Sequence, residues 1–107
     1  MIVDLRTYTL RPGGLSPYLD LYAREGFPVH TSHVGPPLGY YATEIGQLNQ
    51  VVHLWGYENL ADRERRRAAL DADPRWMSYR EKMWAAGNVV RQENKILRSL
   101  TVLDPKP

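Results

Sequence analysis

The sequence contains no cysteine, no long apolar run and no large excess of charge of one sign. The absence of cysteine excludes disulfides and thiolate chemistry. Fourteen basic and twelve acidic side chains give a net charge of +2, which predicts neither a nucleic-acid partner nor a membrane-surface partner. Because no apolar run is long enough for a signal peptide or a membrane span, we expect a cytoplasmic protein.

The chain has 107 residues, of which 43% are hydrophobic. This length fits one domain with a single core, which we place at residues 1–103, followed by a short tail at 104–107. A core of this size is small enough that association with another chain would add to its stability.

The pattern of apolar and polar side chains predicts four strands, at residues 2–10, 39–45, 50–57 and 91–103. The second and third strands are joined as a hairpin around residues 46–49. In the first strand the two faces carry different side chains, with Val3, Leu5 and Thr7 on one face and Asp4, Arg6 and Tyr8 on the other.

The first predicted helix follows the first strand. Ser16 is expected as its N-cap and Pro17 as its first helical residue. Gly26 and Pro28 are expected to end it, since both residues weaken or break helices.

A pair of helices is predicted between the third and fourth strands. Asn59 caps a helix that runs to about Ala72, and Asp73-Pro74 repeats the combination of a cap and a proline to begin another. The second of these helices carries four large apolar residues that we place near one face: Trp76, Met77, Met83 and Trp84.

This order of elements predicts an α+β fold of the ferredoxin-like type, a four-stranded antiparallel sheet with its helices on one face. The other face of the sheet then lacks a cover. The third strand carries a row that is too apolar for open water, formed by Val51, His53, Trp55 and Tyr57. We therefore expect this row to be covered by something other than the helices.

Several segments together resemble the NIPSNAP domain. They are residues 44–57 and 62–67, the first strand with Arg11-Pro12-Gly13, the segment Asp73-Pro74-Arg75-Trp76, and Gln92-Glu93-Asn94 with Ile96-Leu97. The resemblance covers nearly the whole chain. It implies a homodimer in which two sheets pack face to face as a dimeric α+β barrel. The NIPSNAP family has no agreed biochemical activity.

Four residues form the first candidate site: Arg6, Tyr8, His53 and Trp55. They share one sheet face if the first and third strands are neighbours. In one interpretation Arg6 pairs with an anionic ligand, Tyr8 and His53 form hydrogen bonds with it, and Trp55 supplies a wall. The other interpretation, which we favour for a lone strand histidine, is a buried polar network with Asp4 bound to Arg6 and His53 bound to a backbone carbonyl.

A second candidate site is the polar group at the hairpin, formed by Glu44, Asn49 and Gln50. A carboxylate and two amides at a strand end are able to bind a polar ligand. Amide side chains at turns more commonly bond to nearby backbone, which favours a role in fixing the turn.

His30 and His33 lie three residues apart, but no third metal ligand accompanies them, so we expect neither a metal nor another cofactor. The arginines at 63 and 65–67 follow Asp62, and Asp62 and Arg66 have the spacing of a helical ion pair on a solvated face. The NIPSNAP resemblance implies that Arg63 or Arg67 closes a ligand cavity between helix and sheet, with Trp76 and Trp84 as further candidates for its walls.

Nucleophilic hydrolysis is excluded because no cysteine or Gly-x-Ser-x-Gly motif occurs. We expect a protein that binds a small organic molecule, anionic or aromatic, in a cavity either at the dimer seam or between sheet and helices. One alternative is a cofactor-independent enzyme that resembles monooxygenases, isomerases or decarboxylases and uses His53 or Tyr8 as acid or base. The other is a protein-interaction module, since eukaryotic members of the family are associated with vesicle trafficking and mitochondria.

Overall fold

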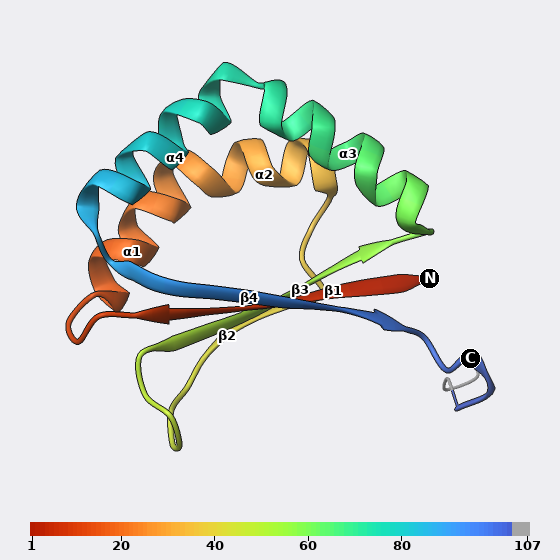
Figure 1. The fold of residues 1–107 in the computed structure, drawn as a ribbon, viewed down its shortest axis with the longest axis horizontal. Coiled ribbons are helices and arrows are strands. Elements are labelled where there is room, and N and C mark those ends of the chain that lie inside the picture. Colours follow the sequence, from red (N-terminus) through yellow and green to blue (C-terminus); the bar gives the residue numbers. More distant parts are fainter. Residues whose placement is uncertain (104–107) are drawn as a thin grey trace.

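The computed structural model describes residues 1–103 (Figure 1). The strands are β1 (Ile2–Leu10), β2 (Gly39–Ala42), β3 (Gln50–Tyr57) and β4 (Val89–Arg98). The helices are α1 (Leu15–Leu21), the π-helix η1 (Tyr22–Gly26), α2 (Phe27–Val34), α3 (Leu60–Ala72), α4 (Pro74–Ala86) and the 3₁₀-helix η2 (Thr101–Leu103). The predicted tail at 104–107 lies outside the described residues.

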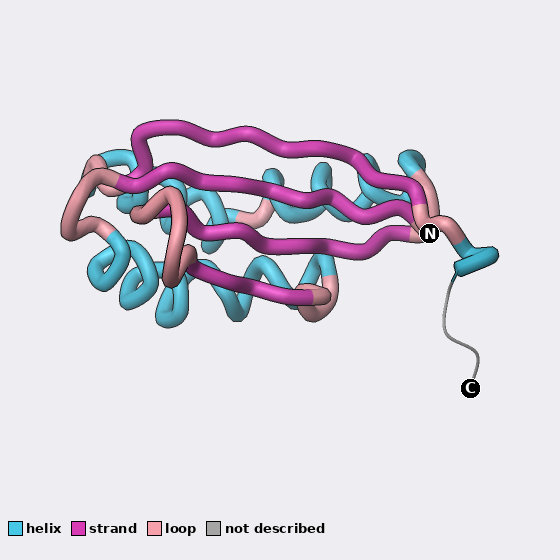
Figure 2. The backbone as a smooth tube through the Cα atoms, turned by 90° about the horizontal axis from the view of Figure 1, so that it is seen from below, coloured by secondary structure: helices cyan, strands magenta, loops and turns pink. Residues whose placement is uncertain are grey.

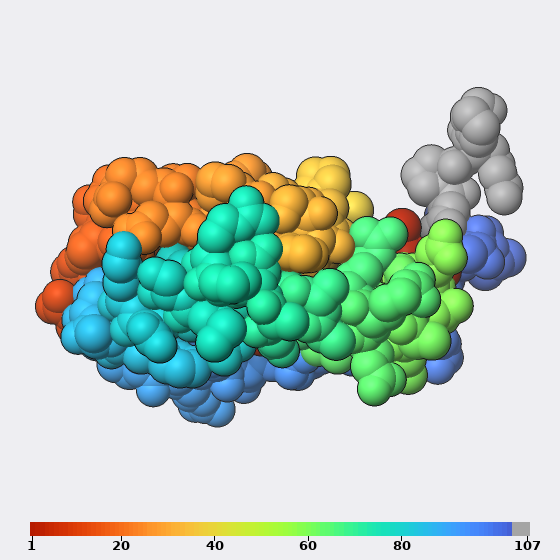
Figure 3. Space-filling view, turned by 90° about the horizontal axis from the view of Figure 1, so that it is seen from above, coloured from red at the N-terminus to blue at the C-terminus, as the bar shows by residue number. Residues whose placement is uncertain are grey.

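The four strands form one antiparallel sheet in the order β2-β3-β1-β4. Helices α1 to α4 all lie on one face of this sheet, and the view from below shows the strands with the helices behind them (Figures 1 and 2). From above, the row α1-η1-α2 and the row α3-α4 lie next to each other and cover the sheet (Figure 3). The predicted α+β, ferredoxin-like fold is confirmed.

The prediction for the row on β3 is wrong in one respect, because this row faces the helices of its own chain. Val51, His53, Trp55 and Tyr57 are each at most 3% exposed. Alternation along a strand separates two faces, but it does not say which of them the helices cover. The row therefore does not require a partner chain to bury it.

The uncovered face carries the other set of side chains. Strand register places on it Val3 and Leu5 of β1, Val52 and Leu54 of β3, Tyr41 of β2 and Leu97 of β4. Tyr41 is 61% exposed and Leu97 is 39% exposed, and the remaining four are half-buried. On β3 both faces thus carry apolar side chains, and its second apolar face lies on the side of the sheet that the helices leave open.

The first helical segment continues beyond Gly26 and Pro28, contrary to the prediction. Pro28 lies in the first turn of α2, directly after the π-helix η1, and proline is tolerated in the first turn of a helix. Gly26 serves close packing, since a Cβ there would lie 2.6 Å from Tyr22 and 2.9 Å from Tyr79. The helix also begins earlier, with Gly14 in place of Ser16 at the N-cap.

The predicted boundary between α3 and α4 is confirmed. The Asn59 side chain accepts a hydrogen bond from the backbone N–H of Asp62, and the Asp73 side chain accepts one from that of Arg75. The four apolar residues of α4 do not share a face, however. Trp76 and Met83 are each 8% exposed, whereas Met77 is 49% and Trp84 is 60% exposed.

Two predicted strands differ from the observed ones at their ends. β2 stops at Ala42, and β4 begins at Val89 and stops at Arg98. None of the helices within residues 1–103 is long and apolar enough to cross a membrane.

Candidate functional site

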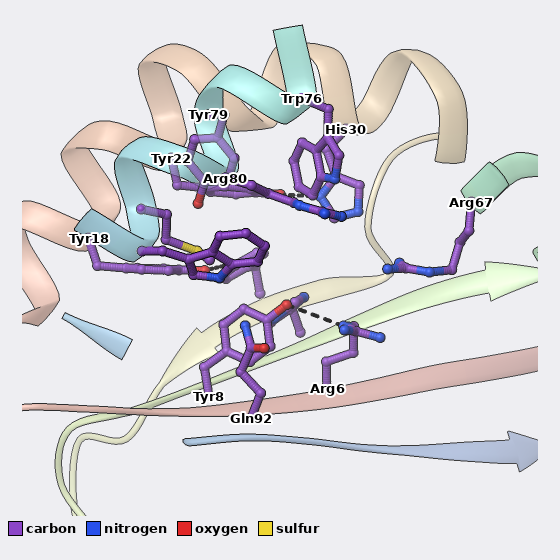
Figure 4. Close-up of a pocket in the computed structure, with 14 residues that line it drawn as sticks. Arg6, Tyr8, Tyr18, Tyr22, His30, Arg67, Trp76, Tyr79, Arg80 and Gln92 are labelled. Carbon is purple, nitrogen blue, oxygen red and sulfur yellow. Dashed lines mark hydrogen bonds between the residues drawn. The ribbon is translucent and has the colours of Figure 1, made fainter. Parts of the chain in front are cut away.

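A cavity of about 190 Å³ lies between the helices and the sheet (Figure 4). Its lining comes from β1, β2, β3 and β4 below and from α1, η1, α2, α3 and α4 above. The lining residues are Arg6, Tyr8, Tyr18, Tyr22, His30, Tyr40, His53, Arg67, Trp76, Tyr79, Arg80, Met83, Trp84 and Gln92. Trp84 and Gln92 are exposed, which places the mouth of the cavity between α4 and β4.

Three of the four residues of the first candidate site line this cavity. Arg6 and His53 are direct partners across β1 and β3, and the Tyr8 ring meets the His53 ring edge-on at 4.7 Å. The Arg6 guanidinium donates from Nε to the Tyr8 hydroxyl at 3.3 Å. The predicted neighbourhood of β1 and β3 therefore brings these side chains together.

Trp55, the fourth residue, lies beside the cavity and is 1% exposed. Its indole Nε1 donates a hydrogen bond of 2.6 Å to Nδ1 of His53. The ring of His30 packs against its indole at a centroid distance of 3.9 Å. The expected bond from His53 to a backbone carbonyl is thus replaced by a bond between side chains.

The bond from Trp55 determines which nitrogen of His53 carries the proton. An indole N–H is only a donor, so Nδ1 of His53 must be the acceptor. Burial, with the positive charge of Arg6, lowers the pKa of His53 to about 3, so the ring is neutral near pH 7. A neutral ring with an unprotonated Nδ1 carries its hydrogen on Nε2, and the ring belongs to a residue that lines the cavity.

His30 is the second buried histidine of the cavity. Its Nδ1 lies 2.8 Å from the Tyr22 hydroxyl. Burial lowers the pKa of His30 to about 3, and the nearby His53 and Arg67 act in the same direction. Both imidazoles are therefore neutral near pH 7.

Tyrosines form much of the upper and side walls. The Tyr18 and Tyr40 hydroxyls lie 2.6 Å apart, and the Tyr40 ring stacks on the His53 ring at 4.5 Å. Burial raises the pKa of Tyr18, Tyr22, Tyr40 and Tyr79 well above the ordinary value of a phenol. These hydroxyls keep their protons at neutral pH.

Four buried polar atoms of lining residues have no hydrogen-bond partner within residues 1–103. They are Nε2 of His30, Nε2 of His53, Nε1 of Trp76 and Nε of Arg80. A buried polar group without a partner loses its hydration with no compensation. All four belong to residues that line one cavity, so the lining has hydrogen-bonding capacity that the described residues leave unused.

The charged side chains of the lining are all arginines, since the lining contains no aspartate or glutamate. Arg6 reaches Asp4 at 3.3 Å, and Arg80 reaches Asp71 at 3.0 Å. Arg67 makes no ion pair with the residues that the structure describes. The acidic partners of Arg6 and Arg80 lie outside the lining, so the charges that the lining itself presents are all positive.

Asp4 holds two arginines at the base of the site and is fully buried. Its carboxylate accepts hydrogen bonds from Arg6, from Arg63 at 3.1 Å and from Asn94 at 3.0 Å. Burial alone would raise the pKa of Asp4, but the bond from Asn94 and the charges of the two arginines outweigh it and hold the pKa below its usual value. Arg63 thus forms an ion pair with Asp4, whereas Arg67 lines the cavity.

The neighbouring arginines of α3 form the expected local ion pairs. Arg66 lies 2.9 Å from Asp62, and Arg65 lies 2.8 Å from it. Neither arginine is among the residues that line the cavity.

The hairpin residues of the second candidate site do not line the cavity. Glu44 is exposed in the connection between β2 and β3. Asn49 has a left-handed backbone with φ of 63°, and its carbonyl accepts a bond of 2.7 Å from the N–H of Leu10. The Gln50 amide donates to the Thr9 hydroxyl at 3.1 Å.

His30 and His33 have different surroundings, although both lie on α2. His30 is turned toward the cavity, whereas Nε2 of His33 lies 2.9 Å from a carboxylate oxygen of Asp73. No group of three or more histidine, aspartate or glutamate side chains in residues 1–103 is arranged to hold a metal ion.

Several lining residues were absent from the predicted site: Tyr18, Tyr22, His30, Tyr40, Tyr79, Arg80, Met83 and Gln92. A weak signal existed, because Tyr18 and Tyr22 lie four residues apart on one helix and Tyr79 and Met83 do so on another. Such spacing marks a buried face but does not distinguish a cavity wall from a core. The predicted wall candidates Trp76 and Trp84 both line the cavity.

The NIPSNAP family model matches residues 3–103 of this chain. Among curated proteins, a NipSnap homolog of Dictyostelium discoideum is 33% identical over 94 residues, which cover 88% of this chain and 40% of that protein. Human NipSnap homolog 3A is 32% identical over 68% of this chain and 29% of its own length. The chain thus spans well under half the length of these relatives.

Solved structures agree with this match. An uncharacterized NIPSNAP-like domain protein of Burkholderia xenovorans is 46% identical, with a TM-score of 0.88 over 99% of this chain and 90% of its own. Protein Atu4242 of Agrobacterium tumefaciens is 41% identical, with a TM-score of 0.86 over 92% of each chain. A structure described as an antibiotic biosynthesis monooxygenase is 12% identical with a TM-score of 0.62 over 94% of this chain and 99% of its own, which shows a common fold alone. Since the family model matches residues 3–103, this chain belongs to the NIPSNAP family.

Proposed function

We propose that this protein binds a small organic molecule in the cavity between the helices and the sheet. The observation that carries the proposal is the set of four unpartnered polar atoms on residues that line one cavity. Aromatic walls combined with a few polar groups that point inward are typical of small-molecule sites. Of the two locations expected from the sequence, the one between sheet and helices is the better supported.

Binding is better supported than proton abstraction by His53. A general base near pH 7 needs a pKa close to that value and a free nitrogen lone pair. The pKa of His53 is lowered to about 3, Nδ1 already accepts the Trp55 bond, and Nε2 carries the hydrogen. His53 is therefore suited to donate a hydrogen bond to a ligand.

A thermal-shift screen of single-ring compounds tests the proposal. A ligand at about 100 times its Kd adds about 2.7 kcal/mol to the free energy of unfolding, which raises Tm by about 10 °C for a domain of this size. Trp84→Ala at the mouth should weaken the shift. Met77→Ala, an exposed residue of the same helix outside the lining, should leave it intact. If no compound of a broad panel shifts Tm, or if both variants respond alike, the proposal is wrong.

We also propose that two chains associate through their uncovered sheet faces. The proposal is supported by the apolar side chains that this face presents, among them Leu5, Leu54 and Leu97, and by the expectation that a domain of this size gains stability from association. Each cavity lies on the opposite side of its sheet, so binding within a cavity does not require the partner chain.

A further inference from the structure

We infer that the ligand of this cavity is a carboxylic acid with a single aromatic ring, bound as its anion. The inference rests on the proposed function and adds the charge, size and hydrogen-bonding character of the ligand. Three independent properties of the lining carry it, namely its donors, its charge and its volume.

Three of the four unpartnered atoms must carry a hydrogen, and all three are therefore hydrogen-bond donors. The indole Nε1 of Trp76 and the Nε of Arg80 carry hydrogens and have no lone pair to offer. Nε2 of His53 joins them, because the bond from Trp55 forces the hydrogen onto that nitrogen. Three donors without partners call for a ligand that is rich in acceptor oxygens, and they do not suit an amine.

The charge of the lining selects among such ligands. Arg6, Arg67 and Arg80 are present without any acidic lining residue, and Arg67 has no ion-pair partner in residues 1–103. Positive charges of Arg6 and Arg67 act on both His30 and His53. Figure 4 shows Arg6 and Arg67 directed toward the space under His30, and Arg80 extending toward it from α4. A carboxylate offers two oxygens with four acceptor positions and matches the fork of a guanidinium.

The volume and the walls limit the rest of the ligand. A buried apolar cavity of about 150 Å³ holds one benzene molecule. The cavity of about 190 Å³ therefore has room for one ring and a carboxylate. Tyr18, Tyr22 and Tyr79 form an aromatic wall at the end of the view opposite Arg67, which suits edge-on or stacked contact with a ring (Figure 4).

The experiment compares compounds of matched shape by calorimetric titration. Benzoate supplies the ring and the anion, benzamide keeps the shape without the charge, benzylamine reverses the charge, and acetate lacks the ring. We expect benzoate to bind at least about tenfold more tightly than each of the others, since hydrogen bonds to a charged group are the stronger ones.

Two variants test whether the preference arises at this cavity. Arg67→Met should reduce the preference for benzoate over benzamide by about tenfold. Arg65→Met is the matched control, because Arg65 lies on the same helix, pairs with Asp62 and is outside the lining. It should leave the preference unchanged.

Equal or tighter binding of benzamide or benzylamine would overturn the inference of an anion while the proposed binding function stands. Acetate binding as tightly as benzoate would overturn the inference of a ring. A benzoate preference that survives Arg67→Met in a folded variant would place the site elsewhere and overturn the assignment. Absence of binding by all four probes would overturn the inference, whereas the proposed function falls only if the broad screen also yields no ligand.

Discussion

The indole of Trp55 donates a 2.6 Å hydrogen bond to Nδ1 of His53, two residues earlier on the same strand. Both side chains are 1% exposed, so water does not compete for either nitrogen. The bond sets the tautomer of His53, a residue of the cavity lining, and places its hydrogen on Nε2. A residue outside the lining thus determines what the lining offers to a ligand.

Replacing Trp55 with phenylalanine should change the tautomer equilibrium of His53. The variant keeps most of the wall but leaves Nδ1 of a buried ring without its donor, which costs about 1–3 kcal/mol of unfolding free energy. Nitrogen NMR should show Nδ1 as fully unprotonated in the original protein and a mixture of tautomers in the variant. Trp84→Phe, at an exposed tryptophan, serves as control, and an unchanged His53 spectrum in Trp55→Phe would contradict this account.

Asp4→Asn should be strongly destabilising. The change removes the buried carboxylate that holds Arg6 and Arg63, and it leaves two guanidinium groups without compensation. Loss of one partner of a buried ion pair typically costs about 3–5 kcal/mol. Urea denaturation measures this loss of unfolding free energy. Asp20→Asn removes an exposed pair with Arg24 and should cost at most about 1 kcal/mol, so similar losses in both variants would refute the role given to Asp4.

Stability should fall as the pH is lowered from about 6.5 toward 4. His30 and His53 have a pKa of about 3 in the folded protein, below the ordinary value of about 6.5 that they regain on unfolding. In this window the unfolded chain binds more protons, so acid favours unfolding, by up to about 1.4 kcal/mol per pH unit for each histidine. The lowered pKa of Asp4 adds a loss only below about 4.

Urea denaturation at several pH values between 4 and 8 checks this prediction. In His53→Gln the slope of the unfolding free energy against pH should be about half that of the original protein. A flat profile in the original protein would show that neither histidine is held neutral by the fold.

Gly26→Ala should lower stability, although alanine is the better helix former by about 1 kcal/mol. The new Cβ would meet the Tyr22 ring at 2.6 Å and the Tyr79 ring at 2.9 Å, and overpacking of this kind costs about 1–3 kcal/mol. Thermal denaturation checks this prediction. A Tm higher than that of the original protein would mean that the two rings move aside without cost. Both rings line the cavity, so ligand binding should weaken as well.

Leu54→Glu should separate the proposed dimer. The substitution places a charge at the centre of the uncovered sheet face, opposite Leu5 of β1. Light scattering should give a dimer mass for the original protein and a monomer mass for the variant. Ile45→Glu, at a 94% exposed loop position, should remain a dimer. A monomer mass for the original protein at all concentrations would remove the proposal.

The sequence by itself predicted most of the secondary structure and the fold class. Period-two alternation identified β1 and β3, and the caps Asn59 and Asp73 marked the starts of α3 and α4. The neighbourhood of Arg6 and His53 followed from strand order, because sheet pairing fixes which residues face each other. These features depend on local chemistry and on a regular ladder, both of which are visible in a single sequence.

Tertiary structure alone decided which sheet face is covered and what surrounds the cavity. Val51 and Val52 are equally apolar neighbours on opposite faces, so their pattern did not say which one meets the helices. The continuation of the helix through Gly26 depended on the approach of Tyr22 and Tyr79, and the tautomer of His53 depended on the rotamer of Trp55. The polar cavity arises where side chains from nine helices and strands meet. Such contacts depend on the packing of the whole domain, which local spacing does not encode.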